Sequence, residues 1–109
     1  MVKDLVLQLR YLGVIPKPRH FEYGFHIEAK DKSIRLVVLM IEGSFFERND
    51  LMFQEAPDLC YQKVLSDLDN ETADARIPSR VPVTGLDVAH YRQLHPNTKS
   101  RRAAARDSR

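Results

Sequence analysis

The feature that most constrains the fold is a stretch of alternating side chains followed closely by an apolar run. Apolar residues occupy every odd position from Phe21 to Ala29, and the even positions between them hold polar residues or glycine. Alternation with a period of two is typical of a half-buried β-strand. Residues 34–42 centre on six consecutive apolar residues, Leu36 to Ile41, which indicates a strand that is apolar on both faces. Residues 30–33 supply turn chemistry, so we predict that the two strands pair as a hairpin.

Residues 56–69 form the clearest predicted helix. Apolar side chains recur there at i, i+3, i+4 and i+7 with polar residues between them, which is the spacing of an amphipathic helix. Pro57 suits the first helical turn, and Asp58 complements the positive end of the helix dipole. We expect this helix to pack on the apolar face of the hairpin. The expected buried stripe consists of Tyr61, Val64, Leu65 and Leu68.

A second helix is predicted between Thr84 and His95. Thr84 and Asp87 have the spacing of a capping box, and Pro96 stops the helix at its far end. The expected stripe of this helix consists of Leu86, His90 and Leu94, with Tyr91 at one margin.

Three further segments complete the predicted elements. Ser44 and Glu47 also have capping-box spacing, which predicts a short helical turn. Residues 76–83 contain Pro78 and Pro82, each of which removes a hydrogen-bond donor, so this segment is at best an edge strand. The opening segment fits both periods, and we favour a strand over a helix. The strand pattern comprises Leu5, Leu7, Leu9 and Tyr11, and the helix pattern comprises Val2, Leu5, Leu9 and Leu12.

The order of these elements predicts a small α+β fold. An antiparallel sheet is built on the central hairpin, and two helices pack on one of its faces. The 109 residues are the length of one domain, which excludes a two-domain enzyme. We expect residues 1–95 to form this globular domain and residues 96–109 to form a disordered basic tail.

Charge is distributed unevenly between these two parts. Residues 1–95 carry 12 basic and 14 acidic side chains, a net charge of −2, whereas residues 96–109 carry five basic and one acidic side chain, a net charge of +4. The tail could therefore bind the phosphates of RNA or DNA without sequence preference, although it has no aromatic residue for base stacking. A solubilising terminus is the alternative, and no membrane binding is expected because a lipidation motif is lacking. The candidate nucleic-acid-binding residues are Lys99, Arg101, Arg102, Arg106 and Arg109.

Few residues of the sequence are candidates for catalysis or metal binding. His26 and Glu28 lie two residues apart and so project from the same face of the predicted strand. A zinc site needs three or four ligands, and no further ligand has suitable spacing, so we interpret this face as a solvated sheet surface. His90 and His95 are five residues apart, which on a helix points them in different directions. We predict no catalytic residue, no metal and no cofactor.

Cysteine content and hydropathy bear on the compartment. Cys60 is the only cysteine, so no intrachain disulfide can form. Its apolar neighbours predict a buried structural thiol, with a reactive cysteine as the alternative. The longest apolar run is six residues, against about 20 for a membrane span. These observations favour a cytoplasmic protein.

These features favour a non-enzymatic protein that acts through protein–protein contact. Both faces of Leu36–Ile41 are apolar, whereas the two predicted helices cover only one face. The uncovered face, together with Phe45, Phe46 and Phe53, predicts a homodimer or contact with another protein. The alternatives are that the opening segment and residues 45–53 simply close the core, or that the chain associates with nucleic acid through its basic tail.

Overall fold

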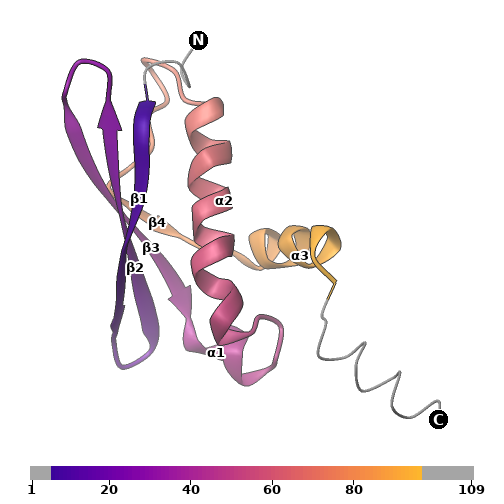
Figure 1. Cartoon of the computed structure of the whole chain (residues 1–109). Coiled ribbons are helices and arrows are strands. Elements are labelled where there is room, and N and C mark those ends of the chain that lie inside the picture. Colours follow the sequence, from indigo (N-terminus) through magenta and orange to yellow (C-terminus); the bar gives the residue numbers. More distant parts are fainter. Residues whose placement is uncertain (1–5, 97–109) are drawn as a thin grey trace.

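The predicted hairpin lies at the centre of a four-stranded sheet with the order β1-β2-β3-β4 (Figure 1). The computed structural model describes residues 6–96, so the chain ends, including nearly all of the predicted tail, lie outside the described residues. The α+β fold class is confirmed, and the main helices lie on one side of the sheet. In chain order the elements are β1 (Val6–Pro16), β2 (His20–Ala29), β3 (Ile34–Glu42), α1 (Gly43–Glu47), the short 3-10 helix η2 (Phe53–Glu55), α2 (Ala56–Asp69), β4 (Arg80–Pro82) and α3 (Gly85–Leu94).

The hairpin of β2 and β3 forms as predicted. The two strands pair antiparallel, with Tyr23 opposite Leu39. In the connecting turn the backbone N–H of Ser33 donates to Asp31 Oδ1 at 2.9 Å, and Lys32 adopts a φ of 71°. An aspartate that accepts from the backbone two residues on is a common way to close such a turn. The odd-numbered residues of the alternating stretch face the core, as the period of two requires.

From Val6 onward the opening segment is a strand, which confirms the favoured prediction over the helical alternative for the described residues. β1 pairs antiparallel with β2 along most of its length. The register shifts between Tyr11 and Gly13, where Gly13 has a φ of 134°. This conformation is open to glycine and strained for other residues, so the glycine permits a β-bulge that bends the strand.

The last strand, β4, runs parallel to β3, so the predicted antiparallel sheet is mixed at this edge. Val38 lies opposite Arg80 and Met40 opposite Pro82. Parallel strands need a crossover connection, and α2 provides it on its way from β3 to β4. Pro82 is tolerated because β4 is an edge strand with one side free of a partner strand.

The buried face of α2 differs from the predicted stripe. Val64 and Leu68 are buried as expected, but Tyr61 and Leu65 are 38% and 42% exposed. The buried face of the helix is therefore rotated about the helix axis by about 100°, roughly one residue, from the predicted face. It includes a row of side chains that the sequence pattern did not predict, which packs toward the hairpin and consists of Ala56, Leu59 and Cys60.

The predicted stripe of α3 is wrong, although its start is right. The capping box forms, since Asp87 N–H donates to Thr84 Oγ1 at 3.2 Å and Thr84 N–H donates to Asp87 Oδ2 at 2.8 Å. Val88 and Tyr91 are the buried residues of this helix. The Tyr91 hydroxyl donates to Asp58 Oδ2 of α2 at 2.7 Å, which fixes how α3 is rotated. As a result Leu86, His90 and Leu94 point to solvent.

The cap predicted for α1 is also wrong. This helix begins at Gly43, directly after β3, and no side chain caps it. The backbone N–H of Gly43 instead donates to the carbonyl of Arg19 at 2.9 Å, because the loop between β1 and β2 lies beside this end of β3. A carboxylate cap occurs further on, where Glu55 Oε1 accepts from the N–H of Met52 at 2.9 Å.

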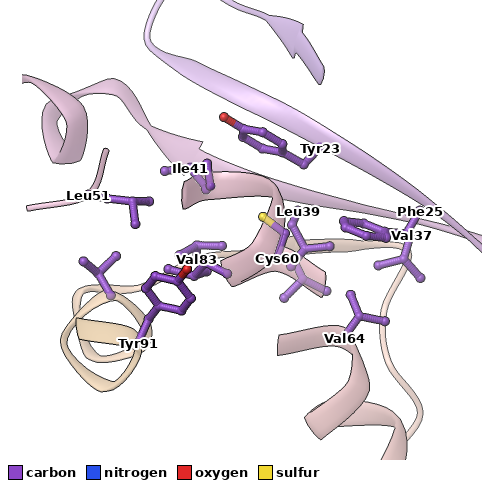
Figure 2. Close-up of a cluster of buried hydrophobic side chains, with 14 of the residues drawn as sticks. Tyr23, Phe25, Val37, Leu39, Ile41, Leu51, Cys60, Val64, Val83 and Tyr91 are labelled. Carbon is purple, nitrogen blue, oxygen red and sulfur yellow. The ribbon is translucent and has the colours of Figure 1, made fainter. Parts of the chain in front are cut away.

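The core lies between the inner face of the sheet and the helices (Figure 2). Tyr23, Phe25 and Leu39 reach into it from the sheet and are fully buried. At one end the rings of Phe46 and Phe53 each pack edge to face against Phe21 and stack on each other. The ring centroids in these three pairs are 5.2 to 5.3 Å apart. Phe21 faces the helix side of the sheet, so Phe21 and Phe46 help to close the core, whereas Phe53 packs on them and remains 50% exposed. The prediction that Phe46 and Phe53 add to the uncovered face of the sheet is therefore wrong.

Glu71 is the one charged residue that is buried among the described residues. It follows α2, and its carboxylate accepts two hydrogen bonds from the guanidinium of Arg35 on β3, at 2.8 and 2.9 Å. It also accepts from the backbone N–H of Ile77 at 2.8 Å. These bonds attach the segment that leads to β4 to the central strand, and they satisfy a carboxylate that burial would otherwise penalise.

Replacing Glu71 with glutamine should lower the free energy of unfolding by about 2 kcal/mol near pH 7, because Arg35 loses its charged partner in a partly buried site. The hydrogen bond from Arg35 in particular holds the pKa of Glu71 below its usual range. The stability that this bond contributes is therefore present above the ordinary pKa and is lost as the pH falls through the lowered one. In denaturant titrations, the free energy of unfolding of the variant should therefore depend less on pH across this acidic range than that of the original chain.

Asp50→Asn is the matched control for Glu71→Gln. Asp50 pairs with Arg48 at 2.9 Å, but both side chains are largely exposed. The control should change the free energy of unfolding by less than about 1 kcal/mol. An equal loss in the two variants would contradict the anchoring role of Glu71.

Cys60 lies in the core, as predicted, with no exposed surface. Burial raises the pKa of its thiol to about 12, so the reactive thiolate is scarce near neutral pH. In the native protein we expect an aromatic disulfide reagent to label Cys60 at least about 100-fold more slowly than in denaturant. Labelling at the free-thiol rate without denaturant would show that the thiol is accessible.

Candidate functional site

The face of the sheet opposite α2 is the candidate site, and we call it the open face. Because side chains alternate along a strand, the residues between the buried positions of β3 all point to this side. The helices lie on the other side of the sheet (Figure 1). The open face comprises Gln8, Arg10, Leu12 and Ile15 of β1, His20, Glu22, Gly24, His26 and Glu28 of β2, Ile34, Leu36, Val38, Met40 and Glu42 of β3, and Arg80 and Pro82 of β4.

Large apolar side chains dominate the open face. Ile34 and Leu36 are each 60% exposed, Ile15 is 58% exposed and Leu12 is 55% exposed. An antiparallel sheet that faces water normally carries polar residues on its outer side. Together these four side chains expose on the order of 400 Å², a patch size that on a monomer often marks an interaction site.

A glycine joins the apolar residues of β1 and β3 into one surface. At Gly24, on the strand between them, the position of a Cβ would lie 3.8 Å from Leu12 Cβ and 4.0 Å from Leu12 Cδ1. Leu12 therefore rests on the bare backbone of β2, next to Val38 in the neighbouring strand. Because no side chain of β2 intervenes here, the apolar surface continues across three strands.

The charges on the open face are few and partly paired. Arg80 Nη2 donates to Glu22 Oε2 at 2.6 Å, and His20 Nε2 lies 3.1 Å from the same oxygen. The bond from Arg80, and then that with His20, hold the pKa of Glu22 below its usual range. With Arg10, Glu28 and Glu42 added, the face carries two arginines and three glutamates. It thus has no excess of positive charge.

His26 and Glu28 share the open face, as the strand period predicts. Arg10 and Leu36 lie directly opposite His26 on the two neighbouring strands. Within residues 6–96 no three His, Cys, Asp or Glu side chains are grouped so that they could hold a metal ion. The structure therefore adds no third ligand to this pair among the described residues. Both side chains are half-buried, and His26 Nδ1 is buried without a hydrogen-bond partner in that part of the chain.

A cleft lies between α2 and α3, away from the open face. It measures about 210 Å³, and Lys63 and His90 are among its lining residues. Lys63 Nζ lies 3.2 Å from Asp87 Oδ1 and 3.7 Å from Asp67 Oδ2. The lysine is neutralised within the protein, so this arrangement ties the two helices together.

A second exposed apolar area lies on the helix side, where β1 extends past α2. Tyr11, Tyr61 and Leu65 are 37% to 42% exposed there. The ring of Tyr11 lies 5.3 Å from that of Phe25, and the ring of Tyr61 lies 6.3 Å from it. These tyrosines are thus partly packed on the core, whereas the residues of the open face have nothing above them in the described part of the chain.

The sequence pattern revealed only part of this surface. Ile34 and Leu36 belong to the apolar strand from which an uncovered face was predicted. Leu12 and Ile15 were missed, because the bulge at Gly13 shifts the alternation between them, and that glycine was the only signal. The pair of Glu22 and Arg80 joins residues 58 positions apart, which no local pattern reveals.

The five basic residues predicted to bind nucleic acid are not placed by the structure. Lys99, Arg101, Arg102, Arg106 and Arg109 lie outside the described residues. Among the helices that are described, none has the length and the apolar character needed to cross a membrane.

Comparisons of this chain with protein-family models, with curated proteins and with solved structures found no match. The functional argument therefore starts from the geometry and chemistry of the open face.

Proposed function

We propose that this protein acts without catalysis, as an interaction module that binds a protein partner through the open face. The observation that carries the proposal is the exposure of Ile34 and Leu36 on the central strand of the sheet. Apolar side chains at such positions gain free energy when a partner removes them from water, at roughly 25 cal/mol per Å². Catalytic chemistry has less support, because within residues 6–96 no third His, Cys, Asp or Glu side chain joins His26 and Glu28 in a metal-binding group.

Charge also supports a protein partner for this face. The face carries two arginines and three glutamates, so it offers no positive field for a polyanion. Charged side chains of β2 lie between the apolar side chains of β1 and β3, and such a mixture of polar and apolar area is usual in protein–protein interfaces.

Leu36→Glu should weaken partner binding at least about 10-fold, because it places a charge in the centre of the apolar surface. Leu94→Glu is the matched control, since Leu94 is also 60% exposed but lies on α3, away from the open face. The full chain and both variants are tagged and used in quantitative pull-downs, and thermal melting checks that each remains folded. Capture of the same proteins in equal amounts by all three chains would overturn the proposal.

Nucleic-acid binding through residues 96–109 is the second candidate, and the concentration of positive charge in this segment favours it. Five basic side chains could release about five condensed counterions, which would make binding strongly salt-dependent. The segment would act apart from the open face, because its affinity would come from phosphate contacts.

The test changes Lys99, Arg101, Arg102, Arg106 and Arg109 to glutamine in the full chain. Fluorescence anisotropy with a labelled single-stranded oligonucleotide should show an affinity that falls with salt, with a slope near −3.5 on logarithmic axes, for about five contacts. The variant should bind the oligonucleotide much more weakly, and its residual affinity should no longer depend strongly on salt. Equal binding by the two chains would remove the basic segment from consideration.

A further inference from the structure

We infer that the partner on the open face is a second copy of this chain, packed sheet to sheet about a twofold axis. The inference rests on the proposed function and names its partner. In such a dimer the same surface of each copy contacts the other, so the open face must fit itself in area, charge and shape. Each of these requirements can be checked against the described residues.

The apolar area has the size that a dimer of this kind needs. A standard interface buries about 800 Å² on each partner, of which a little over half, about 450 Å², is apolar. The four exposed side chains of the open face supply on the order of 400 Å² on each copy. They are Leu12, Ile15, Ile34 and Leu36. Two copies would therefore cover this surface without leaving a large apolar remainder.

The charges of the open face do not oppose a second copy. Each face carries two arginines and three glutamates, so two faces repel each other only weakly through net charge. Glu22 is already bound to Arg80 within each chain. Arg10, Glu28 and Glu42 remain, and a twofold axis presents the arginine of each copy to the face that holds the glutamates of the other.

The shape of the sheet also favours packing on the face over pairing at the edge. The sheet has two edges, β1 and β4, at which two sheets could join. The bulge at Gly13 interrupts the register of β1, and β4 has only three residues, one of which is Pro82. Bulges, prolines and short edge strands are common means of blocking edge-to-edge pairing. On the open face, by contrast, Leu12 lies over Gly24, and sheets pack face to face about 10 Å apart.

Light scattering after size-exclusion chromatography tests the inference on the full chain. At tens of micromolar the mass should be twice 12.6 kDa, and it should return to the monomer value on dilution. Leu36→Glu should raise the dissociation constant of the dimer at least about 10-fold, whereas Leu94→Glu should leave it unchanged. A monomer at every concentration, or a dimer that Leu36→Glu does not weaken, would overturn the inference.

Cysteine cross-linking then locates the interface. Because Cys60 is fully buried, a short bismaleimide should react mainly with an introduced cysteine. Leu36→Cys should yield covalent dimers and Leu94→Cys should not. The reverse pattern would place the contact elsewhere.

The two proposals can fail separately. If the chain stays monomeric but Leu36→Glu still abolishes capture of a distinct protein, the proposed function holds and the second copy is excluded. If the chain is monomeric and Leu36→Glu changes nothing in the pull-down, both are excluded.

Discussion

The constraint on which the structure depends is that the central strand β3 is apolar on both of its faces. It pairs with β2 along its whole length and with the short strand β4 over Val38–Met40. Its inner side chains, among them Leu39 and Ile41, are fully buried under the helices. The crossover helix α2 and the last helix α3 both lie on that side (Figure 1), so the other face of β3 receives no cover from them. An apolar row therefore remains in contact with water.

The groups with shifted pKa values have structural roles in this fold. Burial holds the Cys60 thiol in its neutral form, and Arg35 holds Glu71 in its charged form. Glu55 is likewise charged because Arg92 donates to it at 2.6 Å, which attaches α3 to the segment before α2. Each of these groups is held in one protonation state near neutral pH, whereas an acid or base catalyst works best when its pKa lies near the working pH.

Local patterns predicted the elements well and their packed faces poorly. The bounds of β3 and α2, the capping box of α3 and the turn between β2 and β3 follow from the spacing of neighbouring residues. The buried faces of α2 and α3 depend on what each helix meets in space. In α3, for example, the bond from Tyr91 to Asp58 turns Leu86 and Leu94 toward solvent. In a short helix with a weak apolar stripe, such a contact decides which face is buried more strongly than the spacing of the apolar residues does.

The candidate site shows the same division. An apolar strand with turn residues on either side can be recognised from the sequence, because a period of two assigns side chains to faces without any tertiary information. That alternation, and the presence of too few elements to cover two faces, already indicated an exposed apolar row. The parallel pairing of β4, the bulge at Gly13 and the pair of Glu22 and Arg80 arise only when distant segments meet. Only the folded chain decides these features, since backbone pairing and charge pairing between distant residues leave no periodic trace along the sequence.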